Sequence, residues 1–503
     1  MRKSDEGSTT SYWEATEQLR EPRSLTSDVE TDVCVIGAGI AGLTTAYLLA
    51  REGRNVTVVD DGLIGAGETC RTTAHLSNAI DDRIYRIEKW HGEEKAKLAV
   101  AAHTAAIDQI EQNVRDENID CDFTRLDGYL FEAEDGDDDL EEEFEAARRS
   151  GPAGVEFVDR APVPGFESGR CLRFPNQGQF HILKYLSGLC DAIERMGGKL
   201  FSHTHVVEWS GGESPKVSNA NGQTISAKQI VLATNYPLMS KMFAQLPAYR
   251  TYAIGVPLIE PLTEPILLWD TADPYHYIRT QNENGRQILI VGGEDHRTGQ
   301  ENDGEVRFQR LYSWTKKNFP QVGELEYKWS GQCFETHDGL AFLGRYSDSE
   351  PNIFLITGDS GMGMTHCTIG AMLVTDLIAG RENPLEEVFS PSRIATQSIT
   401  EAVPEVVAST VPYKEWVTGG DIESVSELKN GEGGVLRDGL SKYAVYRDED
   451  GNLIKRSAVC THMGCIVQFN STEKTWDCPC HGSRFSVDGE VINSPAISPL
   501  EQP

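Results

Sequence analysis

The chain has 503 residues and a formal net charge of −32, because 78 acidic side chains stand against 46 basic ones. A field of this sign repels phosphate backbones and anionic lipid surfaces, so we expect no nucleic-acid partner. The length predicts two or three domains, and a hydrophobic fraction of 39% is enough to build their cores.

No apolar run in the sequence has the length of a membrane span, and the start of the chain lacks the apolar core of a signal peptide. Of the eleven cysteines, seven are scattered, as in proteins whose thiols stay reduced. We therefore expect a cytoplasmic protein with no membrane span. The other four cysteines lie close together near the C-terminal end and require a local explanation.

The predicted elements divide the chain into four regions. Residues 1–30 are polar without a clear period and predict an N-terminal arm. Residues 31–385 alternate strands and helices, except that 250–345 has strands separated by turn residues, typical of an antiparallel sheet. Residues 386–415 contain several prolines and predict a linker. Residues 416–503 contain short strands joined by glycine turns and predict a small all-β domain.

Four cysteines and two histidines are grouped in two short loops of this last domain. The loops are Cys460-Thr461-His462-Met463-Gly464-Cys465 and Cys478-Pro479-Cys480-His481-Gly482-Ser483. Together they offer two thiolates and two imidazoles, which can hold a two-iron cluster with cysteines on one iron and histidines on the other. A zinc site is the alternative interpretation. Cys465 and Cys480 count against zinc, because a four-ligand set does not need them.

These loops, with the flanking strands from about 416 to 503, resemble the Rieske ferredoxin family. The resemblance implies four ligands of a 2Fe-2S cluster: Cys460, His462, Cys478 and His481. The cysteines are then bound to the inner iron and the histidines to the outer one. The resemblance also implies a disulfide between Cys465 and Cys480.

Two further positions affect the expected reduction potential. The resemblance implies a hydrogen bond from the hydroxyl of Ser483 to a sulfur of the cluster. High-potential members have a tyrosine two residues later, where this chain has Phe485. Since fewer hydrogen bonds to sulfur stabilise the reduced cluster less, we expect a potential below that of the quinol-oxidising members.

A glycine-rich turn near the start of the chain predicts a dinucleotide site. The run Gly37-Ala38-Gly39-Ile40-Ala41-Gly42 follows an apolar strand and opens a helix. Gly37 permits the tight turn, Gly39 lets the backbone approach a pyrophosphate, and Gly42 lets helix and strand pack closely. The helix N-terminus binds the pyrophosphate. Asp60 ends the next strand, where its carboxylate can accept from ribose hydroxyls.

Two later segments favour FAD over a nicotinamide cofactor. A late strand, turn and helix start contains the expected cofactor residues Gly361, Gly363, Met364 and Thr365. The N–H groups of such a helix end can stabilise the negative charge of a reduced flavin. The other segment is the strand at residues 229–235, which commonly closes a cofactor domain. A second glycine-rich βαβ unit for a nicotinamide cofactor is absent from the sequence, so the substrate itself is expected to reduce the flavin.

Over roughly residues 30–385 the chain resembles the D-amino-acid oxidase-like family of the glycine and sarcosine oxidase type. Besides the glycine turns, the matching segments are Gly65-Ala66-Gly67 through Arg71, Gln179-Phe180-His181 with Tyr185, Ala233-Thr234-Asn235, and Trp329 with Thr336-His337-Asp338-Gly339. The resemblance implies an α/β Rossmann-like FAD domain interleaved with an antiparallel-sheet substrate domain, followed here by the small all-β Rieske domain. It also implies that Arg71 and Thr72 bind the cofactor.

The same resemblance places a small substrate under the flavin, between strands of the second domain. Arg279 is the candidate that pairs with a substrate carboxylate, Tyr277 donates beside it, and His296 takes a proton. Each residue also has an ordinary interpretation: a structural ion pair, sheet packing and a turn residue, respectively. Covalent flavin attachment occurs in relatives, and Cys333 and His75 are the nearest positions here.

The leading hypothesis is a flavin-dependent dehydrogenase that oxidises a small amine, amino acid or similar substrate. Electrons then pass from FAD through the Rieske cluster to an external one-electron acceptor, a protein or a quinone. One alternative reverses the flow, so that the cluster feeds the flavin for a reductase or oxygen-activating reaction. The other is a non-catalytic redox sensor or electron carrier.

Overall fold

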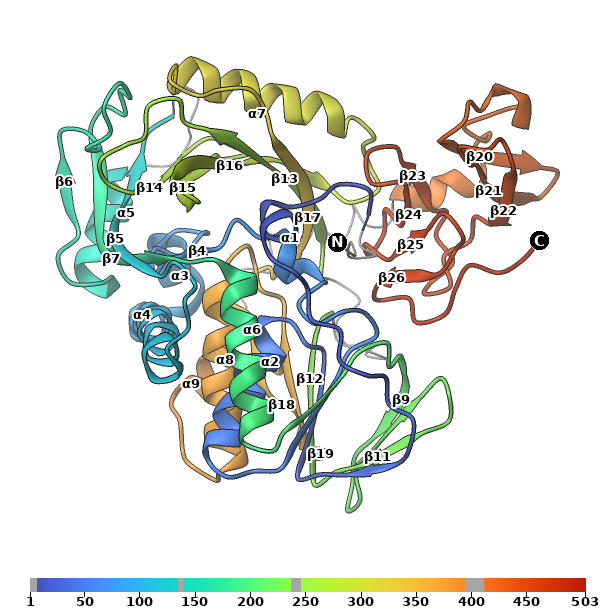
Figure 1. Ribbon diagram of the computed structural model, residues 1–503, viewed down its shortest axis with the longest axis horizontal. Coiled ribbons are helices and arrows are strands. Elements are labelled where there is room, and N and C mark those ends of the chain that lie inside the picture. Colours follow the sequence, from blue (N-terminus) through green and yellow to red (C-terminus); the bar gives the residue numbers. More distant parts are fainter. Residues whose placement is uncertain (1–6, 134–139, 237–245, 394–410) are drawn as a thin grey trace.

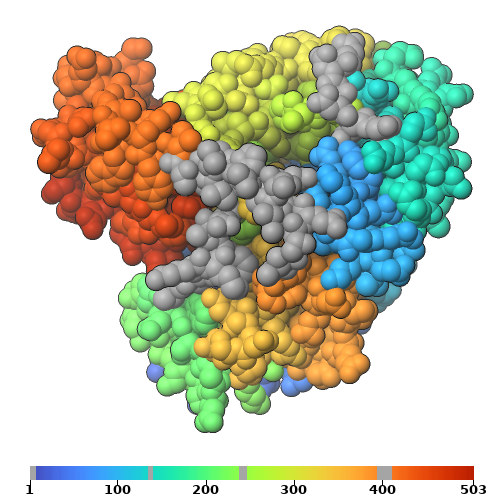
Figure 2. Space-filling model, turned by 180° about the vertical axis from the view of Figure 1, so that it is seen from behind, coloured from blue at the N-terminus to red at the C-terminus, as the bar shows by residue number. Residues whose placement is uncertain are grey.

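The computed structural model describes residues 7–133, 140–236, 246–393 and 411–503. These residues form two large interleaved sheet regions and a smaller C-terminal lobe, drawn in orange and red (Figure 1). The space-filling view shows this lobe projecting from one side of the molecule (Figure 2). Within the described ranges, no helix is both long and apolar enough to cross a bilayer.

The first region is built on a six-stranded sheet whose order is β18-β19-β12-β2-β3-β8. Its strands are β2 (Val33–Ile36), β3 (Val56–Val59), β8 (Lys199–Phe201), β12 (Gln229–Asn235), β18 (Phe342–Ser347) and β19 (Glu350–Thr357). All pairs are parallel except β18–β19. Every residue of β2 and β3 is buried, because both faces of the sheet are covered.

Helices cover one face of this sheet and a small sheet covers the other. The helices are α2 (Ile40–Arg51), α6 (Ile182–Arg195) and α8 (Gly363–Ile378), drawn side by side in Figure 1. The small sheet contains β1 (Val29–Glu30), β9 (Val206–Ser210), β10 (Lys216–Asn219) and β11 (Thr224–Ser226). The glycine-rich strand, turn and helix therefore form a Rossmann-like unit, as the sequence predicts.

The second region is a nine-stranded sheet, which confirms the predicted substrate-domain architecture. Its strands are β4 (His75–Leu76), β5 (Thr124–Phe131), β6 (Glu156–Val158), β7 (Cys171–Gln179), β13 (Ala248–Pro257), β14 (Leu267–Asp270), β15 (Tyr277–Glu283), β16 (Arg286–Arg297) and β17 (Tyr327–Phe334). Neighbouring strands are antiparallel, except for the β14–β5 pair. The helices nearby are α3 (Ile84–His91), α4 (Glu93–Glu117), α5 (Leu140–Ser150) and α7 (Gly304–Asn318).

Part of the predicted N-terminal arm is packed against the rest of the protein. It contains the short helix α1 (Tyr12–Thr16), in which Tyr12 and Trp13 are buried. The indole nitrogen of Trp13 donates to the carbonyl of Thr72 at 2.6 Å. Two aromatic side chains therefore anchor a segment whose polar composition suggested little packing.

The predicted linker, residues 386–415, lies partly outside the described residues. Its start belongs to α9 (Leu385–Phe389), where Val388 and Phe389 are buried in the core of the first region. Residues 394–410 are not described. Its end forms the 3-10 helix η2 (Val411–Trp416).

The C-terminal domain contains two small antiparallel sheets. The first is formed by β20 (Glu432–Asp438), β21 (Ser441–Arg447) and β22 (Leu453–Ser457), and the short helix η3 (Val425–Glu427) precedes it. The second is formed by β23 (Gln468–Asn470), β24 (Thr475–Asp477), β25 (Arg484–Ser486) and β26 (Val491–Asn493). The two predicted ligand loops leave from β22 and β24. The domain is small and all-β, as predicted.

Two glycines determine how closely α2 approaches the sheet. Gly37 has φ +104°, and a Cβ atom there would lie 2.3 Å from the carbonyl oxygen of Ala233. A Cβ atom on Gly42 would lie 1.8 Å from the carbonyl oxygen of Gly37. Because both neighbours are backbone atoms, neither clash can be relieved by a side-chain rotation.

We expect Gly42→Ala to lower the free energy of unfolding by at least about 3 kcal/mol, since over-packing against backbone forces the helix away from the sheet. Urea denaturation followed by circular dichroism measures this change. The matched control is Gly419→Ala, because Gly419 is exposed and its added Cβ meets no atom within 4 Å. Equal stability of the two variants would contradict the assigned packing.

Candidate active site and cluster site

A cavity of about 350 Å³ opens at the carboxyl ends of β2 and β3. Eight of the ten residues expected to bind the cofactor line it: Gly37, Gly39, Asp60, Arg71, Thr72, Gly361, Gly363 and Met364. Gly42 instead packs against Gly37, and the hydroxyl of Thr365 is 2.8 Å from Nδ1 of His103. We call this space the cofactor cavity.

Asp60 directly follows β3, and its side chain contacts the glycine-rich turn that precedes α2. Its carboxylate accepts from the backbone N–H of Ala38 at 2.6 Å and from that of Gly62 at 2.9 Å. Burial and the neighbouring charge of Asp61 raise the pKa of Asp60 to about 7. A carboxyl group held in this way can exchange hydrogen bonds with ribose hydroxyls.

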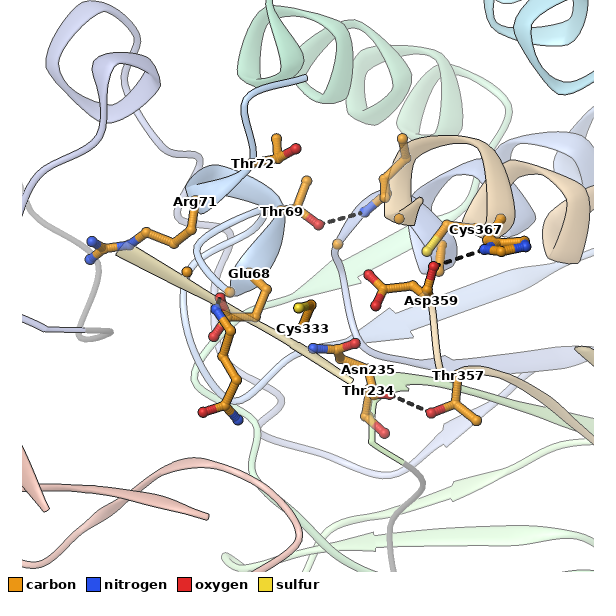
Figure 3. A pocket seen from close by; sticks show the side chains of 18 of the residues that line it. Glu68, Thr69, Arg71, Thr72, Thr234, Asn235, Cys333, Thr357, Asp359 and Cys367 are labelled. Atoms are coloured by element: carbon orange, nitrogen blue, oxygen red, sulfur yellow. Dashed lines mark hydrogen bonds between the residues drawn. The ribbon is translucent and has the colours of Figure 1, made fainter. Parts of the chain in front are cut away.

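Several buried polar atoms of residues that line the cofactor cavity lack a hydrogen-bond partner among the described residues. They include the amide nitrogen of Asn235 and the Oδ1 atom of Asp359. In Figure 3, both side chains border the same space as Glu68 and Cys333. Since buried polar groups normally have partners, a donor and an acceptor aimed into one cavity fit a flavin ring, which offers both kinds of group. The residues present therefore fit FAD.

Part of the lining of the cofactor cavity is acidic. Asp81, Asp295 and Glu335 all line it. Burial and the charge of Asp81 raise the pKa of Asp295 to about 7. Burial, followed by the charges of Asp82, Asp81 and Asp295, raises the pKa of Glu335 well above its usual value. The described carboxylates thus repel one another across a small space.

Tyrosines and a threonine lie among these carboxylates. Tyr275 hydrogen-bonds with Asp81, and Thr251 hydrogen-bonds with Asp295. The hydroxyl of Thr251 also bonds to that of Tyr277. All of these side chains line the cofactor cavity, which connects them to the flavin-binding turns.

The three predicted substrate residues are not brought together. Tyr277 lines the cofactor cavity. Arg279 is fully buried elsewhere, where its Nη1 donates to the carbonyls of Ala74 at 2.8 Å, Phe180 at 3.1 Å and Thr73 at 3.2 Å.

His296 also lies outside the cavity lining. Its Nε2 is 2.9 Å from the hydroxyl of Tyr252, and its Nδ1 is 2.9 Å from the carbonyl oxygen of Arg297. Both ring nitrogens are therefore occupied by protein partners. Cys333 and His75, the positions considered for covalent attachment, do line the cavity.

Sequence reasoning missed the acidic residues of the cavity wall. Asp295 directly precedes His296 in the sequence, but successive side chains of a strand point to opposite faces. Asp81 and Glu335 come from two other segments, so no local pattern joins them. The acidic pair Asp81-Asp82, which follows Ile80, was a feature of the sequence that could have indicated an acidic site.

The two ligand loops of the C-terminal domain lie against each other. The ring centroids of His462 and His481 are 5.0 Å apart, and the thiols of Cys460 and Cys478 are hydrogen-bonded. Nδ1 of His462 is buried without a hydrogen-bond partner among the described residues. Two thiols beside two imidazoles, one with an unused buried nitrogen, fit a 2Fe-2S cluster.

The predicted disulfide between Cys465 and Cys480 is present. It joins the two loops, and the sulfurs of Cys465, Cys478 and Cys480 lie within 4.8 Å of one another. These two cysteines are therefore not additional metal ligands. The disulfide closes one side of the space in which the cluster binds.

The residues expected to adjust the potential are buried next to the loops. Ser483 is fully buried, and its hydroxyl is hydrogen-bonded with the thiol of Cys460. Phe485 is also fully buried, opposite Trp476 in the β24–β25 pair. A tyrosine at position 485 would thus place its hydroxyl group among the buried residues next to the ligand loops.

We expect Phe485→Tyr to raise the reduction potential of the cluster. A hydrogen bond that strengthens by about 1 kcal/mol on reduction corresponds to roughly 40 mV for one electron. Voltammetry of the holoprotein measures the shift, and Phe485→Leu serves as the control that removes the ring without adding a donor. An unchanged potential in Phe485→Tyr would refute the assigned role of this position.

Comparisons with known proteins agree with this geometry. A family model described as FAD dependent oxidoreductase matches residues 32–377, and one described as Rieske [2Fe-2S] domain matches residues 420–503. The Bacillus subtilis protein YhfW, whose name describes a Rieske 2Fe-2S iron-sulfur protein, is 32% identical over 98% of this chain and 97% of its own. The gamma-glutamylputrescine oxidoreductase of Escherichia coli is 28% identical over 74% of this chain and 89% of its own.

Solved structures confirm the fold of the larger part. Glycine oxidase from Geobacillus kaustophilus has a TM-score of 0.60 at 18% identity and covers 73% of this chain and 99% of its own. L-proline dehydrogenase from P. horikoshii has a TM-score of 0.59 at 18% identity and covers 73% of this chain and 98% of its own. The chain therefore belongs to the FAD-dependent oxidoreductase family and carries a C-terminal Rieske domain that holds a 2Fe-2S cluster.

Proposed function

We propose that the chain is a dehydrogenase that oxidises a small cationic amine and delivers the electrons, through the Rieske cluster, to an external one-electron acceptor. The observation that supports this proposal is the composition of the cofactor cavity, whose lining includes Asp81, Asp295 and Glu335. Bound FAD supplies hydride acceptance. The protein supplies the binding, orientation and proton transfer described below.

The charge of the cavity favours a substrate with a positive amine end. Seven acidic residues line the cavity against two arginines, and both arginines have carboxylates or carbonyls nearby. A cation placed between the carboxylates relieves their mutual repulsion and lowers their raised pKa values. A substrate carboxylate gains no such stabilisation, because Arg279 is committed to backbone carbonyls.

Asp295 is suited to accept a proton from the amine. Its pKa of about 7 lies where a general base works best near neutral pH, and its Oδ1 has no partner among the described residues. Thr251 and Tyr277 hold the other side of this carboxyl group through a chain of hydrogen bonds. Proton removal at Oδ1 prepares the amine for loss of hydride from the adjacent carbon.

The acceptor is proposed to approach the first ligand loop. His462 is partly exposed there, and Met463 beside it is 52% exposed. The second loop is turned inward, and His481 is only 8% exposed. A protein or quinone that takes one electron at a time can therefore reach the cluster from the His462 side.

We expect putrescine, added anaerobically to the holoprotein, to bleach the flavin before the cluster. L-alanine, which carries a carboxylate, is expected to react far more slowly, because the described arginines of the cavity lining, Arg71 and Arg83, already have carboxylate or carbonyl neighbours. Stopped-flow absorbance at the flavin and cluster bands measures both. Cluster bleaching that precedes flavin bleaching would support the reversed electron flow instead.

The affinity for a permanent cation is expected to rise about tenfold from pH 6 to pH 8. A carboxyl group with a pKa of about 7 is mostly neutral at pH 6 and mostly charged at pH 8. Calorimetry with butyltrimethylammonium isolates this effect, because the ligand does not titrate. In Asp295→Asn the pH dependence should shrink, whereas Glu301→Gln, at an exposed position, should retain it. A flat profile in the unmodified protein would exclude the cation site.

The same raised pKa values affect stability in the opposite direction. A carboxyl group whose pKa is higher in the folded state stabilises the fold less as the pH rises from about 4 through 7. The unfolding temperature of the ligand-free holoprotein should therefore fall over this pH range, because the buried carboxyl groups of the cavity lose their protons. Bound cation should restore more of it at pH 8 than at pH 6, which differential scanning calorimetry measures.

A further inference from the structure

Two carboxylates of the Rieske domain are buried against the flavoprotein part: Asp477, whose Oδ2 is 3.9 Å from Nε of Arg250, and Glu473, whose contacts are more extensive. Glu473 lies in the turn between β23 and β24 and is 1% exposed. It accepts from the backbone N–H of Thr9 at 3.1 Å and from the hydroxyl of Thr9 at 2.6 Å. The hydroxyl of Ser330 in β17 donates to the same carboxylate. Thr9 and Ser330, which are far apart in the sequence, thus both contact the side chain of Glu473.

Three buried arginines surround Glu473. Burial alone would raise the pKa of Glu473, but Arg71, Arg250 and Arg484 together with the Ser330 hydroxyl lower it to about 2. The carboxylate is therefore charged throughout the neutral range. Removing one member of a buried charge set leaves the others uncompensated, which is strongly unfavourable.

A second contact joins the cluster loop to the cofactor cavity through one residue. The side-chain nitrogen of Gln332 donates to the carbonyl of Gly482, in the loop that carries His481, at 2.9 Å. The hydroxyl of Thr298 donates to Oε1 of Gln332 at 3.1 Å and fixes its orientation. The backbone N–H of Gln332 donates to the carboxylate of Glu68, which lines the cofactor cavity, at 2.6 Å.

The backbones of the two domains are in direct contact beside this residue. A Cβ atom on Gly299 would lie 2.8 Å from the nitrogen of Pro479, and one on Gly482 would lie 2.2 Å from Cβ of Ala248. Gln300 donates to the carbonyl of Pro479 at 3.3 Å. These distances leave no space for even one methyl group, so the second ligand loop is seated directly on the flavoprotein part.

We propose that Glu473 and Gln332 are positioning residues that hold the second ligand loop against the flavin-binding part, so that flavin and cluster exchange electrons across one fixed interface. The inference rests on the proposed exchange between the two centres, and it specifies where that exchange occurs. Bound FAD would supply two electrons, and a cluster held by the two ligand loops would take them one at a time. The first electron would pass to an acceptor before the second is transferred, so two acceptor molecules would be reduced per substrate and the protons would return to solvent.

The test uses the holoprotein and needs no substrate. A light pulse in the presence of EDTA reduces the bound flavin, and bleaching of the cluster absorbance then reports the internal transfer. We expect Glu473→Gln to slow this transfer at least about tenfold, since the docked population falls when Arg71, Arg250 and Arg484 each lose one of their counter-charges. Glu473→Asp should restore part of the rate. Asp450→Asn, an exposed carboxylate in the β21–β22 turn, should leave it unchanged.

A milder variant keeps the inference testable where Glu473→Gln fails to fold. Gln332→Leu removes the side-chain hydrogen bonds with Gly482 and Thr298 and keeps the backbone N–H bond to Glu68. It should slow the transfer while the flavin content and the cluster potential stay the same. Wild-type transfer rates in Gln332→Leu and in folded Glu473→Gln would overturn the positioning role. A cluster that stays oxidised in the unmodified protein would instead overturn the proposed function itself.

Discussion

The arrangement of this protein depends on a charge that is buried between two domains. Glu473 carries its negative charge into a buried space, where three arginines and two hydroxyl groups compensate it. Such a group is costly unless every partner is in place, so it tolerates few alternative positions of the Rieske domain. A smooth apolar contact would allow the domains to slide, whereas a desolvated charge network selects one geometry.

Two adjacent strands serve the interface and the cofactor cavity at once. In β17, Ser330 and Gln332 contact the Rieske domain, while Cys333 lines the cavity. In β13, Arg250 reaches the buried charge network and Thr251 lines the cavity. Because successive side chains of a strand point to opposite faces, two strands can connect both sites. A shift at the interface would therefore also move residues that line the cofactor cavity.

Local patterns in the sequence predict the parts of this protein that local backbone geometry determines. The glycine turn at Gly37 and the two cysteine–histidine loops are such cases, and the predicted fold and cofactors are confirmed. Arg279 shows where such local patterns fail, because its guanidinium donates hydrogen bonds to three backbone carbonyls of residues that are distant in the sequence. Glu473 shows it too, since its hydrogen-bond partners Thr9 and Ser330 lie 464 and 143 residues away in the sequence.

We infer that the flavin and the cluster of one molecule exchange electrons directly. The most direct test is the dependence of cluster reduction on protein concentration after the flavin has been reduced by a light pulse. Exchange within the molecule predicts a first-order rate constant that is the same at every dilution. A rate that falls in proportion to the protein concentration would show that electrons pass between molecules, and would contradict the account.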